Sequence, residues 1–542
     1  MNRMFTPTQA ATPLATFPRR VPVAAPMTDA ASRRFAIAAS ASVLGVSLVF
    51  RVLWLDRLPG INGDEAWYGV QAARFVAGEP WTVRTPTGLV ANPLLFLTES
   101  LLLCIFEPSF WVLRLPIAIW AAIGLALTYV LHRWVYGDPV EAIVVAALTS
   151  CLPAHLAYSR FCWDGSFAFV SLPLVIYPLL KFASGDRTAK TIGLFAAASL
   201  LAIWIHVTHV VLVLAGALCV VWDFREPIAA RVRRLPITTT AALIALVVVS
   251  VVVARKSRDA RILVESMASS LDRLPQHLAS LADVLLGGRV YEYLSGMPMP
   301  AWIRWTYPLF YLGAALVLWQ LHRRGTTRDR RLAMLSVAAC LLILLAGRAL
   351  RLHMASYERY ILYLVPLCGL LLVRGIRAMS GRGGERLGPW ATALPLGVAM
   401  LLLVQFWSCY FRPLCDQRFA SRLHRTFLSG DQEPKAGVAA AIRARLRPGT
   451  TRVVVAQDWW VQYPVDYLLA GRCEVRLDGP EGETPRDCFV VGFADSDFIR
   501  DIRAAASDRH ELREELTIGP AAARPILALL VLGPPTEIDG PP

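Results

Sequence analysis

The sequence predicts a polytopic, mainly α-helical membrane protein with a small α/β domain at its C-terminal end. Three observations lead to this prediction. Hydrophobic residues make up 56% of the 542 residues and charged residues 18%, a balance far from that of soluble domains. The apolar residues fall in runs of roughly 20, the length that a membrane-spanning helix needs. After residue 410, short helix and strand patterns alternate, as in an α/β domain.

The apolar runs predict eleven membrane spans within a membrane domain over 34–410. The residues before them, 1–33, are rich in Thr, Pro and Ala and predict a disordered cytoplasmic tail. The first run is too long for a signal-peptide core, so we interpret it as a signal anchor. The predicted spans are 35–55, 113–132, 140–158, 165–182, 190–206, 207–222, 237–254, 301–321, 332–350, 360–376 and 389–410.

The placement of arginine predicts the orientation. A formal net charge of +15 would suggest nucleic-acid binding, but the arginines gather in short clusters between apolar runs. This is the pattern of cytoplasmic loops, and it excludes a nucleic-acid partner. Segment 93–106 is short and contains Glu99; if it lies in the interface, all of these clusters face the cytoplasm. We therefore predict a bacterial-type inner membrane protein with its N-terminus inside and residues 411–542 outside.

Two adjacent carboxylates, Asp64 and Glu65, follow the first span within the predicted outer loop 56–112. The stretch from Gly63 to Ala77 mixes polar and aromatic residues like a helix that lies in the membrane plane. Charge is costly at a membrane, so these acids favour a functional role. The alternative is that they only stabilise the first turn of this helix.

A third carboxylate, Asp164, lies four residues after Arg160 in a predicted outer turn. The simpler interpretation is that this Asp serves the turn geometry and that the Arg contacts lipid headgroups. The segment from Arg351 to Tyr360 is also predicted outside, against the positive-inside trend. Guanidinium groups bind phosphate in a bidentate fork, which favours an anionic ligand over ordinary headgroup contact. Its other polar residues include Tyr357, Glu358 and Arg359.

Two further regions give weaker candidates. His206 and His209 mark an outer turn between two spans, where packing is the simpler role. The outer loop 255–300 contains amphipathic pieces followed by Tyr291 and Glu292. Such a loop predicts a mobile lid over the substrate, and a surface helix without a role has the same pattern.

Taken in order, these motifs resemble a known family. An Asp-Glu pair opens an interfacial helix, a span begins Arg114-Leu115-Pro116, a Ser-Arg…Asp turn follows, and Glu358-Arg359-Tyr360 opens a late span. This order is similar to that of the GT-C glycosyltransferases, specifically the protein O-mannosyltransferase and aminoarabinose transferase superfamily (glycosyltransferase 39/83-like). The resemblance covers roughly 35–410.

The resemblance implies an inverting glycosyltransferase. It would move a sugar from a polyprenyl-phosphate donor to a hydroxyl of a lipid, glycan or protein on the extracytoplasmic face. Asp64, with Glu65 beside it, would be the catalytic carboxylate that takes the acceptor proton, and Asp164 would be the second acid, which orients the first or the acceptor. The leaving phosphate needs positive charge, for which the candidates are Arg160, Arg351 and Arg359.

Cofactor use stays open at this stage. The aminoarabinose enzymes carry a Lys before the Pro of the second interfacial helix, where this sequence has Asn92 before Pro93. A divalent metal would find oxygen ligands in Asp64, Asp164 and Glu292, while no His or Cys spacing indicates a fixed zinc site. No cofactor is required by the sequence.

The C-terminal region predicts helices over 436–446 and 460–469 and strands over 452–456, 488–493 and 526–532. Asp495-Ser496-Asp497 fits a helix cap better than a nucleotide-sugar motif. In an oxidising compartment, Cys473 with Cys488, or Cys409 with Cys415, would have the opportunity to form a disulfide.

Two other function classes were weighed: a flippase or transporter for lipid-linked sugars, and a scaffold without catalysis. Transporters place charges near the midplane and contain internal repeats. Here the acids gather at one surface and no repeat is visible, which favours the transferase.

Overall fold

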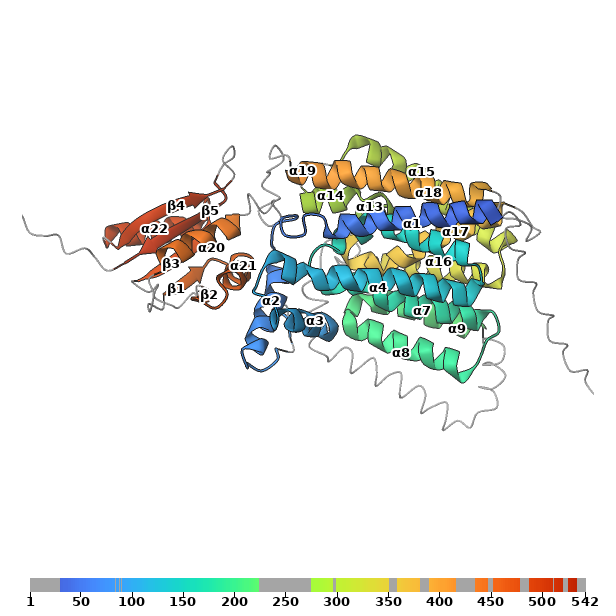
Figure 1. The fold of residues 1–542 in the computed structure, drawn as a ribbon, viewed down its shortest axis with the longest axis horizontal. Helices are drawn as coiled ribbons and strands as arrows, with labels where there is room; N and C mark the ends of the chain where they lie inside the picture. The colour runs from blue at the N-terminus through green and yellow to red at the C-terminus, as the bar shows by residue number, and fades with distance from the viewer. Residues whose placement is uncertain are drawn as a thin grey trace, which may run out of the picture.

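The computed structural model has two parts, a helical bundle and a small α/β domain at one end of it (Figure 1). It describes residues 30–223 except 83, 87 and 89, and then 274–295, 299–349, 358–380, 389–415, 434–446, 452–477, 487–509, 511–519 and 525–533.

The bundle is formed by long apolar helices that run roughly along one direction (Figure 1). Each predicted span coincides with one of them, except 237–254, which lies outside the described residues. The helices are α1 (Ala30–Val52), α4 (Phe110–Tyr136), α5 (Pro139–Cys151), α7 (Ala168–Ala183), α8 (Ala189–Ile205), α9 (Val210–Asp223), α15 (Ala301–Arg324), α16 (Thr327–Ala349), α17 (Val365–Met379) and α18 (Pro389–Phe406).

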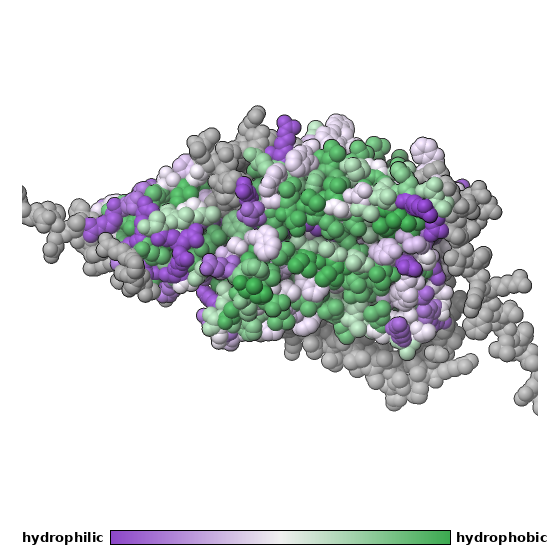
Figure 2. All heavy atoms as spheres, viewed as in Figure 1, coloured by the Kyte–Doolittle hydropathy of each residue, from purple (hydrophilic) through white to green (hydrophobic). Residues whose placement is uncertain are grey.

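Among the described residues, five helical segments are long and apolar enough to cross a membrane. The chain is therefore an integral membrane protein with several apolar membrane-spanning helices, as predicted. The surface agrees with this: hydrophobic residues predominate on the visible side of the bundle, whereas hydrophilic residues gather on the α/β domain and at the far end of the bundle (Figure 2). Large apolar side chains such as Leu200, Leu309 and Leu312 are about 70% exposed, as expected for a surface solvated by lipid tails.

Short helical segments connect the spans. A break at Leu152 and Pro153 divides the predicted span 140–158, because Pro has no N–H for the helix ladder. A turn of π-helix continues α18. These segments are α6 (Pro153–Tyr158), η1 (Asp164–Phe167), η2 (Val207–His209), η4 (Glu358–Leu364), η5 (Trp407–Phe411) and α19 (Arg412–Cys415).

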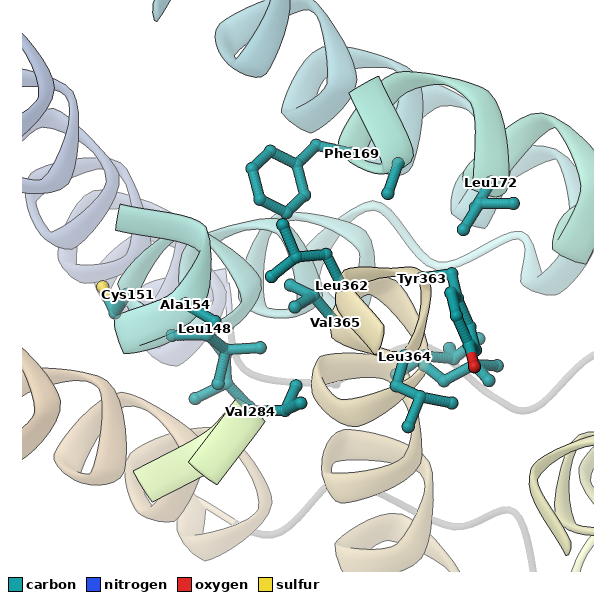
Figure 3. Packing of buried hydrophobic residues seen from close by; sticks show 14 of the residues in the cluster. Leu148, Cys151, Ala154, Phe169, Leu172, Val284, Leu362, Tyr363, Leu364 and Val365 are labelled. Carbon is teal, nitrogen blue, oxygen red and sulfur yellow. The ribbon is translucent and has the colours of Figure 1, made fainter. Parts of the chain in front are cut away.

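The centre of the bundle is a dry cluster to which residues far apart in sequence contribute (Figure 3). Leu148, Phe169 and Leu362 meet there with Val284 of α13 (Leu274–Leu286). The next helix, α14 (Gly288–Ser295), also buries its apolar residues. Residues 274–295 of the predicted lid therefore pack against the core of the bundle, and residues 255–273 lie outside the described residues; a lid over the substrate stays a prediction.

Two shorter helices lie at the end of the bundle next to the α/β domain, and the first of them runs across the direction of the spans (Figure 1). They are α2 (Gly63–Val76) and α3 (Pro93–Leu103). With 11 residues, α3 is roughly 16 Å long, about half the thickness of the hydrocarbon layer. Its Leu97 and Leu101 are exposed, whereas Leu95 and Phe96 are buried. This helix cannot cross the membrane, in line with the interfacial placement of 93–106.

The C-terminal domain is a five-stranded sheet with the order β2-β1-β3-β5-β4. Strands β1, β2 and β3 are parallel, and β5 is antiparallel to β3 and β4. The predicted elements are present, and three that the sequence did not indicate are added: β2, β4 and α22. The elements are α20 (Pro434–Arg445), β1 (Val453–Ala456), α21 (Trp459–Leu469), β2 (Glu474–Leu477), β3 (Cys488–Phe493), α22 (Asp497–Asp508), β4 (Leu512–Ile518) and β5 (Leu527–Leu532).

Two smaller predictions concern this region. Ser496 is the N-cap of α22, because its side chain accepts from the N–H of Ile499, so the Asp495–Asp497 motif is a helix cap. The four cysteines considered above, Cys409, Cys415, Cys473 and Cys488, are not joined by disulfides. Neither of the two disulfides considered from the sequence is formed.

Candidate functional site

The site is built on the first turn of α2. The side chain of Asn62 accepts from the N–H of Glu65, and the Glu65 carboxylate accepts from the N–H of Asn62. This reciprocal capping box satisfies two backbone N–H groups and fixes where the helix begins. Asp64 lies within this fixed turn.

Glu65 is fully buried and bound on both oxygens. Its Oε1 lies 2.6 Å and its Oε2 3.0 Å from the Arg114 guanidinium, and Oε2 also accepts from the N–H of Cys162. Both side chains are fully buried. A carboxylate engaged in this way has no lone pair for a substrate, so the position differs from the predicted catalytic one and fits a residue that anchors α2.

The loop between α1 and α2 is held by two buried arginines. Arg114 donates to the carbonyls of Leu55, Pro59 and Gly60. Arg160 donates to the carbonyls of Phe50, Leu53 and Leu58. Its guanidinium is buried beside the Phe411 ring. Two nitrogens of Arg160 are thus engaged by the backbone, whereas its buried Nε has no hydrogen-bond partner among the described residues; its role at the donor phosphate stays a prediction.

Asp64 contrasts with its neighbour. Its side chain is partly exposed, and among the described residues no hydrogen bond or ion pair to its carboxylate occurs. Burial raises its pKa to about 6; the positive charge of Arg359 opposes this rise, and the negative charges of Asp164 and Glu65 add to it. Asp64 is therefore a carboxylate that can take up a proton near neutral pH.

Asp164 lies in the same cluster, at the start of η1. Its Oδ1 accepts from the N–H of Gly165 at 2.9 Å, and the His206 Nε2 is 3.8 Å away. Burial raises the pKa of Asp164 to about 7, and the nearby Tyr68 hydroxyl opposes this rise. Because Tyr68 follows Asp64 by one helical turn, α2 contributes both an open carboxylate and a hydroxyl to this cluster.

A single described guanidinium accompanies the two carboxylates. Arg359, in η4, donates to the hydroxyls of Tyr293 and Tyr360 at 2.8 and 2.9 Å and lies over both rings. Its positive charge acts on Asp64, whose pKa it lowers, and a guanidinium is a group that binds phosphate oxygens. Arg351 and Tyr357, the other predicted members of this group, lie outside the described residues, as does the side chain of Glu358.

Asn92 is completely buried at the start of α3. Its Oδ1 accepts from the N–H groups of Leu94 and Leu95, and its own N–H donates to the Tyr68 hydroxyl at 3.1 Å. Its side-chain nitrogen has no hydrogen-bond partner among the described residues. A buried donor without a partner is costly, which favours a ligand at this position.

The remaining candidates serve packing. His209 donates or accepts at the Ala202 carbonyl, 3.0 Å away, and His206 pairs with the Thr208 hydroxyl at 2.6 Å. Its Nε2 also lies 3.8 Å from the Asp164 carboxylate, so this ring borders the cluster. Tyr291 is buried against Phe406 in the bundle core. Glu292 is partly exposed beside it.

A metal set was considered for Asp64, Asp164 and Glu292. Within the part of the chain that the structure describes, no three His, Cys, Asp or Glu side chains come together in a way that would hold an ion. The three acids are thus not assembled as a ligand set.

Sequence reasoning missed the roles of two tyrosines and of α21. The position of Tyr68 beside Asp64 could be predicted from its spacing, since a residue four positions after Asp64 shares its helix face. Tyr293 follows Tyr291 and Glu292 in the predicted outer loop, and its spacing indicated no role of its own. No local signal in the sequence indicated that α21 would lie against α2.

Comparison with known proteins gives a match to a protein family and a match to solved structures. Residues 90–254 match the family model described as dolichyl-phosphate-mannose-protein mannosyltransferase. The fold matches the crystal structure of ArnT from Cupriavidus metallidurans in the apo state, with a TM-score of 0.54 and 13% identity over 90% of this chain and 97% of that chain. Over residues 90–254 the chain is thus similar to this mannosyltransferase family, and it shares the fold of ArnT. The predicted resemblance and the predicted enzyme class are thereby confirmed.

Two further solved structures resemble this chain less closely. ArnT from the same organism bound to undecaprenyl phosphate gives a TM-score of 0.48 at 14% identity, over 92% of this chain and 97% of that one. The oligosaccharyltransferase AglB from Archaeoglobus fulgidus, in complex with an inhibitory peptide and a dolichol-phosphate, gives 0.45 at 15% identity, over 86% and 70%. No curated protein matches the chain by sequence.

Proposed function

We propose that this chain transfers a sugar from a polyprenyl-phosphate donor to a hydroxyl acceptor, with Asp64 as the general base. One observation carries the proposal: Asp64 has no hydrogen bond or ion pair among the described residues and has a pKa raised to about 6, whereas the adjacent Glu65 is fully engaged. A general base works best when its pKa is close to the working pH.

The donor class follows from the family. The matched model is named for a dolichyl-phosphate-linked mannose donor, and polyprenyl phosphates of this type keep their lipid tail in the membrane. Arg359 supplies the positive charge for the phosphate, and the buried side-chain amide of Asn92 supplies a hydrogen-bond donor. Membrane lipids surround the bundle, and the acceptor is a lipid, glycan or protein with a free hydroxyl.

The reaction balances with these groups. Asp64 removes the acceptor proton while the acceptor oxygen attacks the anomeric carbon. The bond from that carbon to the phosphate oxygen breaks, and its electron pair leaves with the polyprenyl phosphate. Arg359 stabilises the charge of the leaving phosphate, which therefore needs no proton. Asp164, held by the N–H of Gly165, orients the acceptor.

We place this chemistry on the extracytoplasmic face of a bacterial-type inner membrane. The arginine-rich ends of α15 and α17, with Arg323, Arg324 and Arg377, lie at the end of the bundle away from α2, and positive loops stay inside. Reporter domains fused before residue 30 and after residue 533 should report opposite sides of the membrane.

The test uses the purified full chain in lipid nanodiscs with radiolabelled polyprenyl-phosphate sugars and a membrane extract as acceptor. Asp64→Asn should lower the transfer rate by roughly 10²- to 10⁴-fold while the protein remains folded. The matched control is Asp56→Asn, because Asp56 is an exposed acid in the same outer loop; it should retain the wild-type rate.

Two outcomes would overturn the proposal. Transfer that survives Asp64→Asn would leave Asp64 as a helix-start residue. Absence of transfer from every donor, together with movement of the labelled lipid across vesicles, would indicate a flippase.

A further inference from the structure

The candidate catalytic helix α2 is covered by helix α21 of the C-terminal domain, nearly 400 residues later in the chain. Their contact is very close. A Cβ atom on Gly63 would lie 2.9 Å from Cε3 of Trp459, and a Cβ atom on Gly69 would lie 2.5 Å from Cε2 of Tyr467. Only glycine allows aromatic rings to lie this near the helix backbone.

Polar contacts tie the same two helices together. The Arg74 guanidinium lies 3.0 Å from the Asp466 carboxylate, whose side chain is 10% exposed. The Tyr467 hydroxyl donates to the Ser109 carbonyl at 3.0 Å and accepts from the Ser109 N–H at 3.2 Å. Ser109 is the N-cap of α4, so α21 joins α2 to the start of a bundle helix.

These contacts reach the first turn of α2. The Trp459 ring lies on Gly63, the residue between the capping Asn62 and Asp64. On the side that faces the bundle, the ion pair between Glu65 and Arg114 fixes the same turn. Asp64 thus lies in a turn that the bundle holds on one side and the C-terminal domain on the other.

We propose that α21 is a positioning element of the active site, through which the C-terminal domain sets the location of Asp64. The inference rests on the proposed function of Asp64 as a base. Proton transfer requires the carboxylate within hydrogen-bond reach of the acceptor hydroxyl, and a displacement of about 1 Å costs up to roughly a hundredfold in rate. Arg74, Asp466 and Tyr467 are positioning residues that do not touch the reacting atoms.

The experiment exchanges the charges of the Arg74–Asp466 pair in the full chain in nanodiscs. Arg74→Asp and Asp466→Arg each place like charges together, and the double variant restores an opposite pair. We expect each single variant to lower kcat about tenfold, with the donor KM within about twofold of wild type. Amide hydrogen exchange over 63–76 should become faster, and the double variant should recover both values.

A second variant pair tests the close contact. Gly69→Ala should press on the Tyr467 ring and lower kcat about tenfold. Gly45→Ala is the matched control, because Gly45 lies in a helix and a Cβ atom there would meet nothing within 4 Å. It should leave both kcat and the exchange of α2 unchanged.

The two readouts separate the possible results. Faster exchange in α2 with unchanged kcat would overturn the inference, because α21 would then stabilise α2 without positioning Asp64. A lower kcat with unchanged exchange would also overturn it, in favour of direct contact between α21 and the acceptor. If the wild type transfers no sugar, the proposed function fails, and unchanged exchange in the charge variants would show separately that α21 does not hold α2.

Discussion

The two ends of the helical bundle both contain buried ionisable groups, but these groups are arranged in opposite ways. At the end away from α2, Arg374 lies 2.7 Å from both Asp329 and Glu141. Glu141 also contacts Arg377 and, at 3.0 Å, His132. At the end that carries α2, Asp64 has no such partner among the described residues, and Asp164 has only neutral ones.

This difference separates structural charges from chemical ones. A buried ion pair with all of its partners fixes the helices that carry it, here α4, α5, α16 and α17. A carboxylate without an ionic partner keeps a perturbed pKa and an available lone pair, which is what a catalytic group needs. The same contrast occurs within one turn of helix, between Glu65, paired with Arg114, and the unpaired Asp64.

The largest expected effect is on stability, when the buried ion pairs at the end away from α2 are removed. Arg374→Met leaves Asp329 buried without its cation and leaves Glu141 with Arg377 as its remaining cation, which should cost about 3–5 kcal/mol of the free energy of unfolding. Denaturant titration in detergent would measure this loss, with the partly exposed Arg377→Met as the milder control. The kcat of the folded fraction should stay within about twofold of wild type. A folded but inactive Arg374→Met protein would contradict the division between the two ends.

A substitution at the end that carries α2 should instead lower the transfer rate and leave the stability nearly unchanged. Arg359→Gln removes the charge offered to the leaving phosphate and should lower kcat about a hundredfold, while the unfolding midpoint changes little. Arg359→Lys keeps a charge but loses the planar fork, so its rate should lie in between. Steady-state kinetics with the labelled donor would measure both. An unchanged rate for Arg359→Gln would remove this residue from the phosphate site.

The smallest effect concerns pH. Asp64 acts in its charged form, and its pKa is raised to about 6. The transfer rate should therefore rise with pH up to about 6, level off above it, and fall about tenfold for each unit below it. Rates from pH 4.5 to 8 in nanodiscs would give this profile. A rate that does not change between pH 4.5 and 7 would show that Asp64 is not the base.

Much of the architecture could be predicted from the sequence alone. The length of the apolar runs indicated the spans, because a bilayer imposes one length on every helix that crosses it. The spacing of Asn62 and Glu65 contained the capping box, and both carboxylates of the site were visible as charges at predicted membrane surfaces. These features are local, and local spacing is what a single sequence records.

Tertiary structure decided which charges are paired. Nothing near Glu65 in the sequence indicates Arg114, 49 residues away, and nothing near Arg160 indicates that backbone carbonyls would occupy it. The amphipathic pattern over 274–295 fits a lid and a core helix equally well, and only packing distinguishes them. The contact of α21 with Gly63 and Gly69 likewise depends on two distant segments meeting. The sequence determined which helices form and where the acids lie along them, whereas the packing of distant segments determined which acid remains free to react, because pairing is a property of space and not of chain order.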